Sequence, residues 1–102
     1  MIIYSVTISL EQKIEKDWLQ WMKEEHIPDV MKTGFFKQYN MHKLLEPVME
    51  PDRVSYNIWY LCETLEQLET YREQAGPALQ QAHSSRYGQQ CIAFRTVLEQ
   101  LS

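Results

Sequence analysis

The first ten residues alternate between apolar and polar side chains, and this period of two constrains the fold more than any other feature of the chain. Apolar residues occupy positions 2, 4, 6, 8 and 10, and Ser5, Thr7 and Ser9 lie between them, with Ile3 as the exception. Successive side chains of a β-strand point to opposite faces. Residues 2–10 are therefore predicted to form a strand with one buried face and one polar face.

A helix is predicted to follow this strand. Between residues 13 and 25, an apolar stripe recurs at the helical period, and it consists of Ile14, Trp18, Trp21 and Met22, with Glu25 at its end. Pro28 cannot donate a backbone hydrogen bond, so we expect a break or kink at residues 26–28. A short helical turn over residues 28–32 should then end at Gly34, a residue suited to a C-cap.

A second helix is predicted to begin at residues 64–67, where Thr64 and Gln67 have the spacing of a capping box. Its inner face should carry Leu65, Leu68 and either Tyr71 or Arg72. Gly76–Pro77 should interrupt the helix, which resumes over residues 78–87 and ends at Gly88.

Three further strands are predicted over residues 35–45, 54–62 and 91–101. The order of elements is strand, helix, strand, strand, helix, strand, which is typical of the ferredoxin-like βαββαβ arrangement. We therefore expect an α+β fold: a four-stranded antiparallel sheet with two helices on one face, forming a single domain over residues 1–102.

The composition excludes several classes of protein. Ten basic residues against fourteen acidic ones give a net charge of −4, which argues against nucleic acid as a partner. The three glycines lie far apart, which rules out phosphate-binding glycine loops. No apolar run is long enough to span a membrane. Residues 1–10 lack the basic start, the long apolar run and the cleavage site of a signal peptide, so none is expected. Cys62 and Cys91 fit reduced thiols, so we expect a cytoplasmic protein.

The sheet face opposite the helices is predicted to be polar but nearly uncharged, although a solvated sheet face normally carries Lys and Glu freely. We therefore expect a second copy of the chain to cover it, giving a homodimer with a polar cavity between the two sheets. A wet surface, or a dimer contact without a cavity, is the alternative. The residues assigned to this open face are Ser5, Thr7 and Ser9; Gln38, Asn40 and His42; Ser55, Asn57, Trp59 and Leu61; and Ala93, Arg95 and Val97.

His26 is the first candidate for a catalytic residue. It lies four residues after Met22, on the inward side of the first predicted helix, and histidine is well suited to proton transfer near neutral pH. One interpretation makes it a general base at the mouth of a cavity, oriented by Glu25 or Asp29. The other makes it a structural residue that caps carbonyls at the end of the helix.

His42 and Arg95 form a second candidate pair on the open face. Arg95 would hold an anion while His42 moves a proton, unless Arg95 instead pairs with an acid such as Glu99 across an interface. The predicted ligand-binding residues are Asn40, Asn57, Trp59 and Arg95, with Trp59 stacking on a flat ligand. His83 is expected to be a surface or capping residue. The histidines lack metal-ligand spacing, so no metal and no cofactor are expected.

Three segments resemble a small bacterial family of unknown function, and the resemblance covers nearly the whole chain. They are Trp18-x-x-Trp21-Met22-x-x-x-His26-Ile27-Pro28-Asp29-Val30-Met31, then Ala78-Leu79 to His83-Ser84-x-Arg86-Tyr87, and Ala93-Phe94-Arg95-Thr96. That family is similar to the dimeric α/β-barrel superfamily, which includes antibiotic-biosynthesis monooxygenases, stress-responsive barrel proteins and EthD-like proteins. The resemblance implies a homodimeric barrel with a central cavity and brings no catalytic residues with it.

Three functions remain open at this point. The first is a dimeric barrel that binds a small organic ligand, with cofactor-free oxygenase-like or isomerase-like chemistry as an extension. The second is a non-catalytic structural or regulatory module that only self-associates. The third is a haem-binding or haem-degrading barrel, in which His26 or His83 would be the axial ligand.

Overall fold

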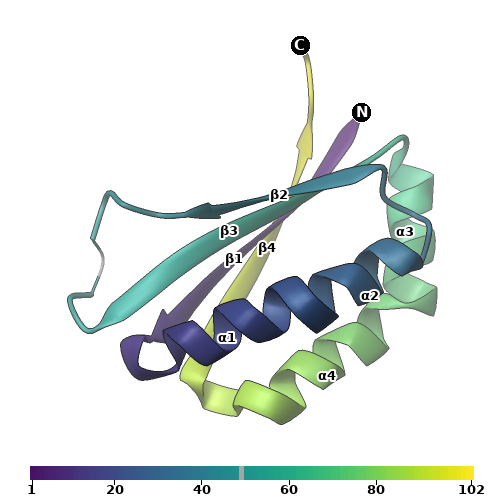
Figure 1. Ribbon diagram of the computed structural model, residues 1–102. Helices are drawn as coiled ribbons and strands as arrows, with labels where there is room; N and C mark the ends of the chain where they lie inside the picture. The colour runs from purple at the N-terminus through teal and green to yellow at the C-terminus, as the bar shows by residue number, and fades with distance from the viewer. Residues whose placement is uncertain (49) are drawn as a thin grey trace.

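The computed structural model describes residues 1–48 and 50–102 and contains a four-stranded antiparallel sheet with the helices against one face (Figure 1). The strand order β2-β3-β1-β4 places the two central strands, β3 and β1, between two edge strands. The predicted α+β, ferredoxin-like arrangement is confirmed. The strands are β1 (Ile2–Glu11), β2 (Gln38–Lys43), β3 (Arg53–Cys62) and β4 (Cys91–Glu99).

The helical layer consists of two long segments joined to the sheet by short turns. The first segment is continuous from α1 through η2 to α2, and the second is divided into α3 and α4 at Ala75, as the Gly76–Pro77 pair predicts. None of the helices in the described part of the chain has both the length and the hydrophobicity needed to span a bilayer. The helical elements are η1 (Gln12–Ile14), α1 (Glu15–Trp21), η2 (Met22–His26), α2 (Ile27–Lys32), α3 (Leu65–Gln74), α4 (Gly76–Tyr87) and η3 (Gly88–Gln90).

Of the break or kink predicted at residues 26–28, the break does not occur, because helical structure continues from α1 through η2 into α2. The chain instead widens into a π-helical turn at η2, where the backbone N–H of Ile27 donates to the carbonyl of Met22, five residues earlier. Pro28 then lies in the first turn of α2, where a missing N–H is tolerated. The helix therefore continues past the proline to Gly34, which has a φ of 82° and closes the segment as predicted.

The core lies between the sheet and the helices, as the alternation in β1 predicts. Side chains from both central strands meet Trp18, Met22 and Leu68, which are almost fully buried. In α3 the inner face is formed by Leu68 and Tyr71, whereas Leu65 is 55% exposed, so its predicted place in the core is wrong. The buried strand residues are Ile2, Tyr4, Val6, Ile8 and Leu10 in β1 and Tyr56, Ile58, Tyr60 and Cys62 in β3.

The orientation of β4 is the reverse of the predicted one. Arg95 pairs directly with Val6, and Ala93 pairs with Ile8. Directly opposed residues of an antiparallel pair project to the same face, so Ala93, Arg95 and Val97 face the helices. The open face instead receives Ile92, Phe94, Thr96 and Leu98, of which Ile92 and Phe94 are 62% and 60% exposed. The small Ala93 side chain leaves space between β4 and the helices.

Thr64 is the N-cap of α3, as predicted, although the reciprocal bond of the predicted capping box goes to a different residue. The hydroxyl of Thr64 accepts from the backbone N–H of Gln67 at 3.1 Å, and the Gln67 side chain accepts from the backbone N–H of Glu63 at 3.0 Å. The second bond thus goes to Glu63, one residue before the cap.

Replacing Thr64 with alanine should lower the free energy of unfolding by about 1 kcal/mol, because a backbone N–H of the first turn loses its acceptor. Urea unfolding measures this. Thr70→Ala is the matched control, since the Thr70 hydroxyl bonds only to the Glu66 carbonyl within the same helix. Equal effects of the two substitutions would show that the cap contributes nothing.

Candidate functional site

The open face carries four of the predicted site residues. Asn40 pairs with Trp59 and His42 pairs with Asn57, so all four share this face, as predicted. The Asn57 amide donates to the hydroxyls of Ser5 and Thr7 at 2.8 Å and 3.1 Å. The rings of His42 and Trp59 lie 6.5 Å apart. Their predicted roles in binding a ligand stay predictions.

Arg95 does not belong to this group. His42 and Arg95 lie on opposite faces of the sheet, so the predicted catalytic pair does not form. The cationic group at one end of the open face is instead Arg53, which donates to the hydroxyl and the carbonyl of Ser9, both at 2.9 Å. The residues opposite the helices are thus polar in the middle of the sheet and apolar along β4.

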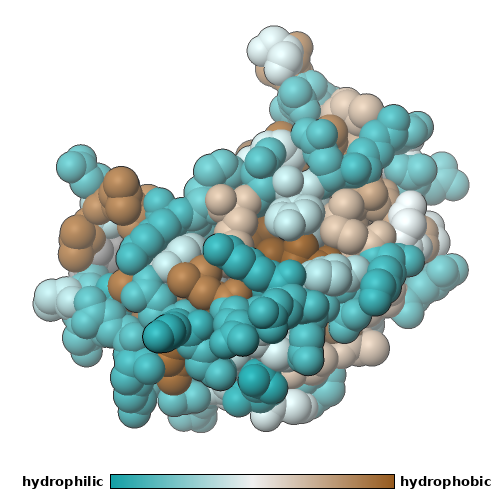
Figure 2. All heavy atoms as spheres, viewed as in Figure 1, coloured by the Kyte–Doolittle hydropathy of each residue, from teal (hydrophilic) through white to brown (hydrophobic). Residues whose placement is uncertain are grey.

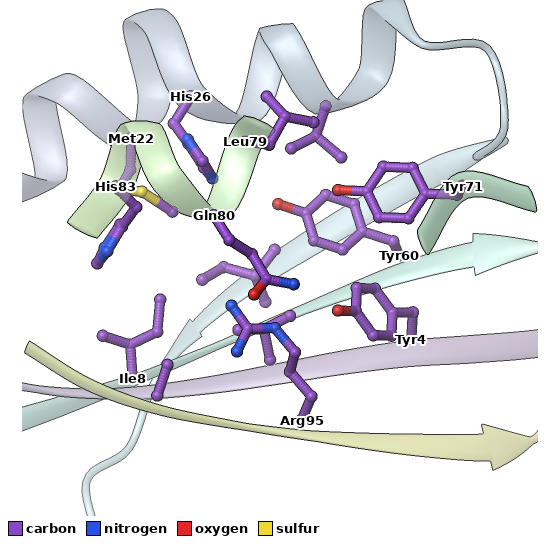
Figure 3. Close-up of a pocket in the computed structure, with 14 residues that line it drawn as sticks. Tyr4, Ile8, Met22, His26, Tyr60, Tyr71, Leu79, Gln80, His83 and Arg95 are labelled. Atoms are coloured by element: carbon purple, nitrogen blue, oxygen red, sulfur yellow. The ribbon is translucent and has the colours of Figure 1, made fainter. Parts of the chain in front are cut away.

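A cavity of about 50 Å³ lies on the other side of the sheet, between β1, β3 and β4 and the helices (Figure 3). Figure 2 shows hydrophobic atoms in a hollow between the strands and the helical layer. A single chain forms this cavity, which is therefore distinct from the predicted cavity between the sheets of two copies. Its lining residues are Tyr4, Val6, Ile8, Met22, His26, Val30, Ile58, Tyr60, Tyr71, Leu79, Gln80, His83, Ala93 and Arg95.

Three tyrosines reach the cavity, and the described residues offer their hydroxyls no hydrogen-bond partner. Tyr4, Tyr60 and Tyr71 are only 4%, 4% and 5% exposed. In the part of the chain that the structure describes, the hydroxyls of Tyr56 and Tyr87 have acceptors, whereas these three form no hydrogen bond. The three hydroxyl oxygens are not fully enclosed by protein atoms, and they open onto the cavity. In Figure 3 all three hydroxyls point toward the same space.

His26 projects from η2 into this cavity, which differs from the cavity between two sheets at whose mouth it was predicted to lie, so its predicted catalytic role stays a prediction. Its ring stacks on Trp21 with centroids 4.9 Å apart. Burial lowers the pKa of His26, and nearby Asp29 opposes that shift. No capping hydrogen bond from the His26 side chain is found at the start of α2. The ring is therefore a neutral group facing the cavity, able to accept a proton.

His83 also lines the cavity, so its predicted surface position is wrong. Trp18 donates its indole N–H to Nε2 of His83 at 3.0 Å, which leaves the proton of the neutral ring on Nδ1. Burial, followed by the charges of His26 and Arg95, lowers the pKa of His83 to about 4. The two histidine rings lie 5.8 Å apart. Trp18 thus fixes the orientation of one member of a neutral histidine pair.

Arg95 and Gln80 complete the polar part of the lining. Figure 3 shows the guanidinium of Arg95 rising from β4 toward the side-chain amide of Gln80, next to the tyrosine hydroxyls. The ion pairs found among residues 1–48 and 50–102 do not include Arg95. The cavity therefore combines apolar walls and several hydrogen-bond donors with one cation, Arg95, which is itself exposed to solvent.

The sequence interpretation missed the tyrosines, although a signal for two of them was present. Tyr4 and Tyr60 belong to the apolar phases of their strands and pair directly with each other. A tyrosine on a buried face brings a hydroxyl that usually needs a partner. Two such residues side by side indicate either a buried hydrogen bond or a site open to a ligand.

The residues around the cavity can be tested for their fit to a metal ion or to haem. Within the described residues, no three His, Cys, Asp or Glu side chains are placed to hold a metal ion. A cavity of about 50 Å³ has no room for a haem macrocycle, and Nε2 of His83 is already occupied by the Trp18 N–H. The residues around the cavity therefore do not fit a haem group.

Solved structures share the fold over nearly the full length of the chain. An EthD family protein from Bacillus halodurans is 13% identical, with a TM-score of 0.72, covering 99% of this chain and 100% of its own. A protein assigned to antibiotic biosynthesis monooxygenases, from Nitrosomonas europaea, is 10% identical, with a TM-score of 0.67 and full coverage of both chains. A dimeric ferredoxin-like protein from an uncultured marine organism is 7% identical, with a TM-score of 0.69, covering 100% and 96%.

At these identities the likeness shows the fold alone. Among curated proteins, none matches this chain. The family model described as a domain of unknown function, DUF4286, matches residues 1–101. Since that match spans all but one of the 102 residues, the chain belongs to the DUF4286 family.

Proposed function

We propose that this protein binds a small organic ligand in the cavity between its sheet and its helices. The observation that carries the proposal is that three buried tyrosines, Tyr4, Tyr60 and Tyr71, face the cavity with hydroxyls that form no hydrogen bond among residues 1–48 and 50–102. Ligand sites typically combine apolar walls with a few convergent polar groups. The names of the similar structures, an EthD family protein and an antibiotic biosynthesis monooxygenase, also support small-molecule chemistry.

His26 is the residue we propose for proton transfer at this site. Its lowered pKa keeps the ring neutral and therefore able to accept a proton near pH 7. The positive charge of Arg95, in the same cavity, would stabilise the anion that a substrate becomes when it loses that proton. Oxygenase-like or isomerase-like reactions without a cofactor both begin with such a step.

Filling the cavity should abolish binding. Ala93→Leu adds three heavy atoms at a lining position, whereas Ala82→Leu adds the same atoms on an exposed position of α4. Backbone amide NMR shifts can be followed while acetamide and acetate, two probes of four heavy atoms, are added. Shifts around Val30 and Tyr60 are expected in the wild type and in Ala82→Leu, and their loss is expected in Ala93→Leu. Identical shifts in all three proteins would place binding elsewhere.

We also propose that two copies of the chain, each folded as one domain over residues 1–102, associate through their open faces. The apolar edge of this face is formed by Ile92, Phe94 and Leu98, which are 62%, 60% and 49% exposed. Contiguous exposed apolar groups of this kind are typical of association surfaces. The similar ferredoxin-like protein from a marine organism is described as dimeric, which supports the same arrangement here.

Phe94→Glu should convert the dimer to a monomer, because it places a charge in the apolar part of the proposed interface. Sedimentation equilibrium should give about twice 12.2 kDa for the wild type and 12.2 kDa for the variant. Leu65→Glu, at an equally exposed position of α3 on the helical side, should remain a dimer. A monomeric wild type, or a Phe94→Glu protein that stays dimeric, would contradict the proposed interface.

A further inference from the structure

Around the cavity lie several hydrogen-bond donors for which the part of the chain that the structure describes supplies no acceptor. A guanidinium has five N–H donors and accepts no hydrogen bond. In the described chain no carboxylate forms an ion pair with Arg95, although the chain as a whole carries a net charge of −4. The site is thus locally cationic within an acidic protein.

The tyrosine hydroxyls add to this donor set. Burial raises the pKa of Tyr71 to about 12, and burial also raises the pKa of Tyr60 well above its usual range. Both phenols therefore keep their protons near neutral pH and can donate them in hydrogen bonds. Figure 3 shows these hydroxyls, with that of Tyr4, directed at the space that the Arg95 guanidinium enters.

We propose that the cavity binds the carboxylate of a small organic acid, with Arg95 as its cationic partner and Tyr60 and Tyr71 as donors to its oxygens. The inference rests on the proposed ligand-binding function and names the class of ligand. A planar carboxylate matches the fork of a guanidinium and accepts from it through both oxygens. The apolar side chains of Val30, Ile58 and Leu79 would surround the short hydrocarbon part of the acid.

Other ligand classes fit this cavity less well. A neutral amide would gain less from Arg95, because hydrogen bonds between a guanidinium and a carboxylate are stronger than those to a neutral acceptor. A phosphate has more oxygens and more negative charge than one guanidinium can compensate, and Arg95 is the one permanently charged residue in the lining. With about 50 Å³ available, the acid has only a few heavy atoms unless side chains such as Gln80 move.

Titration with three probes tests this proposal. Acetate, acetamide and inorganic phosphate are added separately to the full-length protein at constant ionic strength set with sodium chloride, and the amide NMR shifts of the cavity residues give the dissociation constants. Acetate and acetamide have nearly the same shape and differ in charge. We expect acetate to bind at least about tenfold more tightly than acetamide, because charge-assisted hydrogen bonds to an ion are stronger than neutral ones. Phosphate should bind more weakly than acetate.

Four variants assign the effect to individual side chains. Arg95→Gln should remove the preference for acetate, whereas Lys23→Gln, which removes one charge from an exposed site outside the cavity, should keep it. Tyr60→Phe should weaken acetate binding several-fold, and Tyr39→Phe, at an exposed position on β2, should not. Tyr60→Phe preserves the ring that packs in the core, so this variant tests the site even if the Arg95→Gln protein does not fold.

The outcomes separate this inference from the proposed function. Equal binding of acetate and acetamide at the cavity residues would overturn the carboxylate proposal and leave the ligand site in place. Binding of neither probe would contradict both. Tighter binding of phosphate, or an acetate affinity unchanged by Arg95→Gln and by Tyr60→Phe, would also overturn the assignment of a carboxylate.

Discussion

Replacing Trp18 with alanine is expected to lower the free energy of unfolding by about 3–5 kcal/mol, the range found for large-to-small substitutions of buried aromatic residues. The Trp18 side chain is fully buried, and its ring centroid lies 5.1 Å from that of Tyr56 on β3. It also donates the hydrogen bond that holds His83 at the edge of the cavity. Alanine would therefore remove packing and a buried hydrogen bond together.

Trp18→Phe separates these two contributions. Phenylalanine keeps an aromatic ring in the core but cannot donate to Nε2 of His83, so we expect a loss of about 1–2 kcal/mol, the cost of leaving a half-buried acceptor unpaired. Urea unfolding followed by circular dichroism gives both values. A loss below about 1 kcal/mol for Trp18→Ala would be inconsistent with the packing described here.

The free energy of unfolding is expected to fall as the pH is lowered from about 6.5 to about 4, and His83 should be a main cause. The pKa of His83 is about 4 in the folded chain, against 6.5 for an ordinary histidine. Below pH 6.5 the unfolded chain therefore binds more protons than the folded one. The stabilisation is complete above 6.5 and is lost as the pH falls toward 4, by at most about 3 kcal/mol.

The surroundings of His83 explain the direction of this effect. A proton on His83 would lie next to His26 and Arg95, which are both cationic or become so in acid, and would break the bond from Trp18. Asp29 opposes the shift at His26, so His83 should dominate.

Urea unfolding of the wild type and of His83→Gln over this pH range measures the histidine contribution as a difference. Taking this difference removes the pH dependence of stability that comes from carboxylates, such as Glu15, whose pKa is lowered by Tyr56 and Lys43. The variant should lose much of the decline in acid, and His42→Gln, at an exposed position on the open face, should retain it. If the His83→Gln and wild-type curves have the same slope, His83 is not the buried neutral group described here.

Local sequence signals were sufficient to predict most of the fold. The alternation in β1, the capping residues Thr64 and Gln67, and Gly34 after the first helical segment each act within a few residues, so their structural consequences can be read from the chain. The helix does not break at Pro28 because the π-helical turn before it makes Pro28 part of the first turn of α2, where a missing N–H is tolerated.

The candidate site was harder to predict because it depends on how the elements pack. Both phases of β4 contain apolar residues, Ile92 and Phe94 in one and Ala93 and Val97 in the other, so alternation alone cannot say which phase faces the helices. Pairing with β1 decides this, and it moves Arg95 from the open face into the cavity. Asn57 and Trp59 were placed correctly because β3 has one clearly apolar phase.

His83 illustrates the same difficulty on a helix. The polar residues of α4 are spread around the helix, so its sequence does not show which side packs against α1. Contact with Trp18, 65 residues earlier in the chain, determines the orientation of His83. Tertiary packing, rather than local pattern, therefore brings His26, His83 and Arg95 together around one cavity.

The central claim is that the ligand site lies between the sheet and the helices of each chain. A crystal structure of the protein grown with acetate tests it most directly. We predict electron density for the anion between Arg95 and the hydroxyls of Tyr60 and Tyr71, in each copy of the chain. A cavity closed by rearranged side chains, or anion density found only between two open faces beside His42 and Trp59, would contradict the account.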